Sequence, residues 1–230
     1  MKRLFLGIAL AALCGVATAQ EKIEASVGAD LVSKYIWRGQ NCGNGAIQPS
    51  ASLSYVGLSL SAWGSYGIVD AGDSKEFDLT LAYTIGGFTI GITDYFIADD
   101  DADYFMYEAH KTYHTFEANV GYDFGLLALN WYTVFAGADG VNSDGDRAYS
   151  SYVELNAPFK LGGLDWGFAI GAVPYATSFY ADVNGFAVTN VTLSASKDID
   201  ITPSFKLPLF ASITANPAAS KAYFTVGLSF

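Results

Sequence analysis

Apolar and polar residues alternate at every second position along most of this chain. The last ten residues show the pattern without a break, with apolar side chains at Ala222, Phe224, Val226, Leu228 and Phe230. This period indicates strands that have one apolar face and one hydrophilic face. Twelve segments share this strand character, at residues 22–36, 46–55, 58–66, 75–85, 88–97, 114–124, 126–136, 147–159, 164–174, 186–198, 201–213 and 221–230.

The connections between these segments alternate between long and short. The long ones cover residues 37–45, 67–74, 98–113, 137–146, 175–185 and 214–220. The short ones are 56–57, 86–87, 125, 160–163 and 199–200. This alternation is typical of outer-membrane barrels, and each segment is long enough to cross a bilayer as a tilted strand. The pattern predicts an all-β fold, a single closed antiparallel transmembrane β-barrel of about 12 strands. Its short turns are expected on the periplasmic side and its longer loops on the extracellular side.

The first residues have the layout of a cleaved secretory signal peptide. Two basic residues precede an apolar run at 4–16, and the small-residue stretch Ala17-Thr18-Ala19 follows it. This order is that of a signal peptide, and the apolar run is too short for a stable transmembrane helix. We therefore expect a signal peptide at 1–19 and an outer-membrane barrel at 20–230, in a Gram-negative bacterium.

The final strand also predicts how the barrel reaches its membrane. Its apolar positions and its aromatic last residue resemble the signal read by the outer-membrane insertion machinery, which we expect as a partner during biogenesis. The residues of this insertion signal are Phe224, Val226, Leu228 and Phe230. Outer-membrane lipids and lipopolysaccharide are the other expected partners.

The two faces of the predicted strands differ in a way that bears on function. One face carries large apolar residues such as Leu53 and Ile90, and the opposite face carries Ser, Thr and Gly. Small hydroxyl side chains leave a twelve-stranded bore unfilled and hydrated, which favours a narrow channel for small hydrophilic solutes. Ionisable residues also fall on the inward face or at the mouth, namely Lys34, Arg38, Asp78, Glu117, Glu154, Asp165 and Lys206. The alternative is that these pair with one another and close the bore.

Composition excludes several other classes of function. Acidic residues number 23 against 12 basic ones, which gives a formal net charge of −11, so the chain is not expected to bind nucleic acid. Cys42 is the one cysteine beyond the predicted signal peptide, so neither an intrachain disulfide nor a cysteine metal site is expected. No cofactor is implied.

The long loops are rich in aspartate, above all in one cluster of Asp99, Asp100, Asp101 and Asp103. Negative charge at a channel mouth concentrates cations and repels anions, so the channel is expected to favour cations. Alternating oxygen residues at 99–103 and 142–146 start like a calcium loop, but they lack its glycine and its final glutamate. No metal site is expected there.

Three stretches near the start resemble the TorF-like family of outer-membrane porins. They are VSKYIWRG at 32–39, AIQP at 46–49 and GLSLSAWGS at 57–65, and the match covers roughly residues 30–66. A Ser-x-Tyr-x-aromatic-Arg-Gly stretch followed by Trp-x-Ser is the shared feature. The family's Gly-x-Tyr-x-Gly approach to the tryptophan is here Gly57-Leu58-Ser59-Leu60-Ser61. The resemblance implies an outer-membrane channel of unassigned substrate.

Two other classes of function remain as alternatives. A non-conducting adhesin, receptor or scaffold would use its loops, and the aromatic, Asp-rich 98–113 loop is the expected place. A lipid hydrolase would need a histidine beside a nucleophile, and His110, Thr112 and His114 are the candidates. For Arg38, a fixed cation at the outer mouth and a structural ion pair with a carboxylate of a neighbouring strand are both open.

Overall fold

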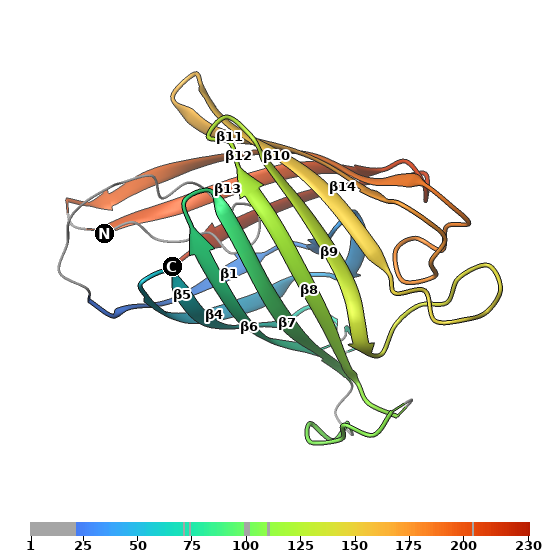
Figure 1. Cartoon of the computed structure of the whole chain (residues 1–230). Coiled ribbons are helices and arrows are strands. Elements are labelled where there is room, and N and C mark those ends of the chain that lie inside the picture. The colour runs from blue at the N-terminus through green and yellow to red at the C-terminus, as the bar shows by residue number, and fades with distance from the viewer. Residues whose placement is uncertain (1–21, 71, 74, 99–101, 110, 204) are drawn as a thin grey trace.

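Twelve strands close into one antiparallel barrel in the computed structural model, which describes residues 22–70, 72–73, 75–98, 102–109, 111–203 and 205–230 (Figure 1). The barrel strands are β1 (Glu24–Val32), β4 (Ala46–Tyr55), β5 (Leu58–Gly67), β6 (Lys75–Ile85), β7 (Phe88–Ala98), β8 (His114–Asp123), β9 (Ala128–Gly137), β10 (Ser151–Leu161), β11 (Leu164–Val173), β12 (Ala187–Thr202), β13 (Phe205–Asn216) and β14 (Lys221–Ser229). The predicted fold class is confirmed. No helix among the described residues is long and apolar enough to cross a membrane.

The barrel wall has one apolar face and one small, hydrophilic face, as the alternation predicts. On β4, Ser50, Ser52 and Ser54 are half-buried toward the bore, while Leu53 and Tyr55 are exposed on the outside. The register carries this parity around the ring, since Ser52 lies opposite Ser61 of β5 and Leu53 lies opposite Leu60. The outer surface is therefore an apolar band of the kind that faces lipid.

The strands are joined by tight turns at one end and by longer segments at the other (Figure 1). The turn between β4 and β5 shows why glycine is placed there. Val56 and Gly57 have φ angles of 48° and 83°, and a Cβ on Gly57 would lie 2.3 Å from the carbonyl oxygen of Thr84. Two positive φ angles make the two-residue turn that matches the twist of a hairpin.

One predicted turn is wrong in position. The sequence predicted a turn at 199–200, whereas β12 and β13 continue their pairing to Asp200 opposite Lys206 and Thr202 opposite Phe205. Residues 197–202 are exposed at the short-turn end. Periodicity shows that a segment is a strand, but it does not mark where the pairing stops.

A larger difference concerns the first predicted strand, 22–36, and the predicted outer loop at 37–45. The wall strand β1 ends at Val32, and a separate hairpin follows, made of β2 (Tyr35–Trp37) and β3 (Gln40–Gly43). This hairpin folds into the bore instead of standing outside the barrel. Tyr35 and Trp37 of this hairpin therefore lie inside the barrel, where they pack against Trp63 and Tyr95.

The barrel closes along a short seam between β1 and β14. Three residue pairs form it, from Asp30 opposite Ser229 to Val32 opposite Gly227. The backbone N–H of Phe230 donates to the carbonyl of Ala29 at 2.9 Å, which extends the seam by one step. The predicted insertion-signal residues Phe224 and Val226 are exposed on the outer face.

Candidate functional site

The tip of the inward hairpin is the centre of the candidate site. Trp37 pairs with Gln40, so Arg38 and Gly39 are the two turn residues, with φ angles of 50° and 82°. Glycine suits such a position, but a left-handed arginine is strained by about 1–2 kcal/mol. Gly39 cannot carry a side chain, because a Cβ there would lie 1.8 Å from the carbonyl oxygen of Thr189 in β12.

The hairpin reaches across the bore from β1 and β4 to the opposite wall. Near its base, the Tyr35 ring packs on Trp63 of β5, with ring centroids 5.4 Å apart. At its tip, the carbonyl of Gly39 accepts a hydrogen bond of 3.0 Å from Asn216 of β13. The Arg38 guanidinium lies 4.0 Å from the ring of Tyr132 in β9, the strand that stands opposite β1 in the ring.

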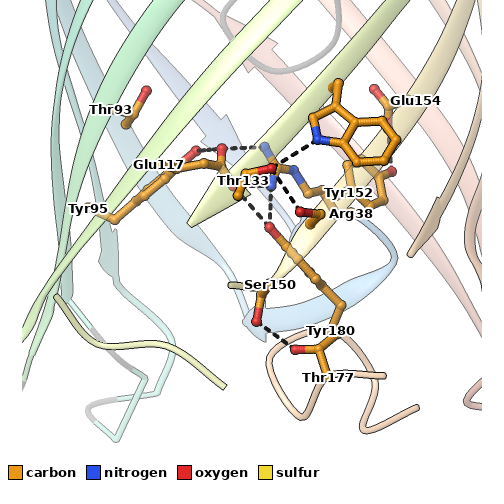
Figure 2. Close-up of polar contacts among 12 residues, drawn as sticks. Arg38, Thr93, Tyr95, Glu117, Thr133, Ser150, Tyr152, Glu154, Thr177 and Tyr180 are labelled. Carbon is orange, nitrogen blue, oxygen red and sulfur yellow. Dashed lines mark hydrogen bonds and ion pairs between the residues drawn. The ribbon is translucent and has the colours of Figure 1, made fainter. Parts of the chain in front are cut away.

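Arg38 forms a two-pronged ion pair with Glu117 of β8 (Figure 2). Its Nη1 donates to Oε2 at 2.6 Å and its Nη2 donates to Oε1 at 2.8 Å. The two side chains are 8% and 1% exposed. This planar geometry is the strong form of the Arg–carboxylate contact, and burial protects it from screening by salt.

Two phenols complete the surroundings of Glu117. Tyr95 of β7 donates to Oε1 at 3.0 Å, and Tyr180, from the segment between β11 and β12, donates to Oε2 at 2.9 Å. The Tyr180 oxygen also accepts from Nη1 of Arg38 at 2.6 Å. Burial raises the pKa of Tyr180 well above its ordinary value, so the phenol keeps the proton that it donates. Each oxygen of Glu117 therefore accepts two hydrogen bonds.

Aromatic rings enclose the guanidinium on its remaining sides. Its central carbon lies 4.0 Å from the ring centroid of Tyr132, 4.8 Å from that of Tyr152 and 5.6 Å from that of Tyr180. Cations are attracted to ring faces within about 6 Å. We call the residues that surround the Arg38 guanidinium the cage; they are the wall residues Tyr95, Glu117, Tyr132 and Tyr152 and the loop residue Tyr180. Of the two readings of Arg38, the geometry is that of the ion pair.

Two further predicted carboxylates face the bore. Glu154 of β10 accepts hydrogen bonds from Tyr152, Asn156 and Asn190, all of them neutral donors. Asp78 of β6 is 8% exposed, and its Oδ1 is buried without a hydrogen-bond partner among the described residues.

The remaining predicted ionisable residues lie at the ends of the barrel. Lys34 donates to Asn44 at the base of the hairpin. Asp165 and Lys206 are in solvent at the short-turn end, 62% and 60% exposed, and each pairs with a residue near it. The loop residue Asp103 is exposed, and its carboxylate accepts from the N–H of Phe105. Asp99, Asp100 and Asp101 lie outside the described residues.

The candidate hydrolase residues are arranged for another role. His114 is buried on the outer side of the wall, where Nδ1 lies 2.7 Å from Asp94 and Nε2 lies 2.6 Å from the carbonyl of Tyr104. The hydroxyl of Thr112 accepts from the backbone N–H of His114. Both ring nitrogens thus contact groups other than the nucleophile candidate, and His110 lies outside the described residues. The contact with the carbonyl of Tyr104 fastens that part of the loop to the wall.

Sequence reasoning missed the tyrosines of the cage. Tyr95, Tyr132 and Tyr152 occupy inward positions of β7, β9 and β10, where small residues were expected. These three could have been predicted from the sequence, because large aromatic side chains at inward-facing positions must fill part of the bore. Tyr180 lies in a connection, where periodicity carries no information.

Comparison with known proteins supports the barrel fold through one solved structure. No protein-family model matches the chain, and no curated protein matches it. Among solved structures, the NanC porin in a rhombohedral crystal form matches with a TM-score of 0.51 and 8% identity, over 89% of this chain and 98% of that chain. The chain has a porin-like fold. The structure of Salmonella typhi OmpF with daunomycin matches with a TM-score of 0.39 and 10% identity, over 91% and 97%. The TorF-like family stays a prediction.

Proposed function

We propose that this protein is an outer-membrane channel of the porin type that passes small hydrophilic solutes and favours cations. The observation that carries the proposal is the two-faced wall. Exposed apolar residues cover the outside, and serine, threonine and glycine line the inside of the short-turn half. The apolar outer surface suits contact with lipid, and the hydrophilic inner surface suits contact with water and polar solutes.

The preference for cations is proposed from the carboxyl groups inside the bore. Carboxyl groups at inward positions of the wall include those of Asp30, Glu76, Asp78, Glu117 and Glu154. Arg38 is the cation placed among them by the hairpin, and Glu117 already pairs with it. Charges close to the path act on a permeant ion with less screening than loop charges in bulk water.

The hairpin makes this channel a narrow one. It crosses the long-loop half of the bore, where side chains of β5, β9 and β13 contact it. Solutes therefore pass beside the hairpin or pass when its tip leaves the cage. We expect the native protein to conduct weakly for a barrel of this size.

Planar-bilayer recording tests the proposal. The purified protein is expected to give discrete conductance steps, and a salt gradient is expected to give a reversal potential of the sign produced by cation flow. Steps with anion selectivity would contradict the cation preference alone. A complete absence of steps, both in the native protein and in a variant with the hairpin tip loosened, would contradict the channel.

The docked hairpin also favours a second candidate, a non-conducting surface protein in which the hairpin is a permanent plug. The two candidates differ in what Arg38→Asn does. Asparagine tolerates the left-handed turn but carries no charge. A channel is expected to show a higher conductance after this change, whereas a plugged scaffold is expected to remain non-conducting.

A further inference from the structure

We propose that the cage is a binding site for guanidinium groups and that Arg38 is its built-in ligand, which a guanidinium-bearing solute can replace. The cage consists of wall residues from β7, β8, β9 and β10 together with Tyr180, whereas Arg38 arrives on a separate hairpin. The expected effect of such a solute on conductance rests on the proposed channel. The binding site itself does not.

The geometry of the cage fits a planar cation with several donors. Glu117 offers both of its oxygens side by side and takes one N–H on each, at 2.6 and 2.8 Å. The Tyr180 oxygen accepts a further N–H at 2.6 Å. A guanidinium presents its donors in a rigid fork that matches these acceptors, whereas an ammonium is a compact point charge.

The rings give the cage its second element of selectivity. The faces of Tyr132 and Tyr152 lie 4.0 and 4.8 Å from the guanidinium carbon. A flat, weakly hydrated cation gains from such faces, while a small hydrated metal ion does not shed its water for them. The site therefore selects for guanidinium over sodium or potassium.

Arg38 is held in the cage by a short piece of chain under strain. The two hairpin strands have three and four residues, and Arg38 itself has a φ angle of 50°. Undocking relieves that strain but leaves Glu117 buried without its cation, which is strongly unfavourable. A solute that supplies a guanidinium removes this penalty. The undocked state with a filled cage is therefore more stable than the undocked state with an empty cage.

The test uses Arg38→Asn, which keeps a residue suited to the left-handed turn and removes the cation. Thermal unfolding in detergent is expected to shift to lower temperature in this variant. Millimolar guanidinium chloride, far below denaturing concentrations, is expected to shift it back in a saturable manner. Urea, which has the same shape but no charge, and sodium chloride at equal ionic strength are expected to give no recovery. Failure of guanidinium to exceed both controls would overturn the proposal.

A second variant isolates Glu117. In Arg38→Asn/Glu117→Gln the cage has no carboxylate, so guanidinium is expected to cause no upward shift. Recovery of the same size in this double variant would show a general salt effect and would overturn the site. In the wild-type protein the tethered Arg38 has a high effective concentration, so the same millimolar guanidinium is expected to cause little shift.

Electrical recording keeps the binding site and the channel apart. In Arg38→Asn, added methylguanidinium is expected to reduce the conductance as it fills the cage. Recovery of thermal stability without any conductance would support the cage and contradict the channel. Conductance without recovery would support the channel and contradict the cage.

Discussion

Arg38 combines two unfavourable features that a single interaction offsets. Its backbone is left-handed and its charge is buried, with 8% of the side chain exposed. The ion pair with Glu117 offsets both costs, and loss of either partner leaves the other as an unpaired buried charge. Breaking a buried pair of this kind costs about 3–5 kcal/mol. Glu117 belongs to the wall strand β8, so loss of the pair is expected to weaken docking of the hairpin and also to lower the thermal stability of the barrel.

The reactivity of the Cys42 thiol indicates whether the hairpin is docked. Burial, with a further contribution from Glu76, raises the pKa of this thiol to about 12. The reactive thiolate is scarce until the pH approaches that value. At pH 8, alkylation of the folded protein is therefore expected to be roughly a thousandfold slower than that of an ordinary thiol. Mass spectrometry after timed exposure to iodoacetamide measures the rate.

The control for this prediction is the same protein unfolded in detergent and urea, where the thiol should react at an ordinary rate. Arg38→Asn is expected to speed the reaction in the folded protein, because an undocked hairpin exposes Cys42. Rapid alkylation of the native protein at pH 8 would show that the hairpin is not held in the bore.

At the scale of elements, the barrel has one strong wall and two weakly held parts. Most neighbouring strands pair over six or more residues, whereas β1 and β14 pair over three. The hairpin of β2 and β3 is the other such part, because it is a separate two-stranded sheet that side-chain contacts at its tip and base, and not strand pairing, attach to the barrel. Motion in this fold is expected at these two places.

The seam yields a prediction about barrel closure. Phe230→Pro removes the N–H that donates to Ala29 at 2.9 Å, while Phe230→Ala keeps that hydrogen bond and removes only the ring. The lost bond is worth about 1 kcal/mol, so the proline variant should unfold at lower temperature than the alanine variant. Band-shift electrophoresis with and without heating compares the two.

The same pair separates the seam from the predicted insertion signal. A defect shared by both variants in outer-membrane yield would point to the aromatic ring, as the insertion signal requires. A defect confined to the proline variant would point to the backbone of the seam. Equal stability of the two purified barrels would contradict the structural role given to that hydrogen bond.

At the scale of the whole molecule, charge has two separate locations. One location is the predicted loop cluster of Asp99, Asp100, Asp101 and Asp103. Its one described member, Asp103, is exposed to solvent. Glu154 lies in the wall and accepts hydrogen bonds from neutral groups. Screening limits exposed charges to about 8–10 Å at ordinary salt. The inner group is thus expected to be the stronger source of the proposed cation preference.

This difference predicts the outcome of two charge-removing variants. Glu154→Gln is expected to lower the cation preference at both low and high salt. Replacement of the four loop aspartates by asparagine is expected to lower it mainly at low salt, where the screening length is longer. Reversal potentials across matched salt gradients measure both. An unchanged potential in Glu154→Gln would remove Glu154 as an origin of the preference.

The strands were predictable because a barrel wall imposes one local rule on every residue. The predicted segments 46–55 and 75–85 coincide with β4 and β6, since lipid outside and water inside select opposite side chains at successive positions. Ends such as that of β12 were misplaced, because pairing continues as long as a partner strand is present. Local alternation does not record the partner.

The candidate site was predictable only in part. Glu117 and Arg38 were identified as inward-facing charges, yet nothing in their spacing of 79 positions joins them. The Tyr-x-Trp alternation at 35–37 is the same in a wall strand as in a hairpin inside the bore. The contacts that distinguish these positions come from β5, β9 and β13, which follow later in the chain.

The sequence by itself determined the class of the protein: an all-β barrel with an apolar outside, a small-residue inside and alternating short and long connections. These properties follow from the solvent on each side of a strand, which acts on residues one at a time. Only the tertiary structure decided that the first connection turns inward and that its arginine enters a cage of four wall residues and one loop residue. That choice depends on contacts between distant segments, whose energies no local pattern contains.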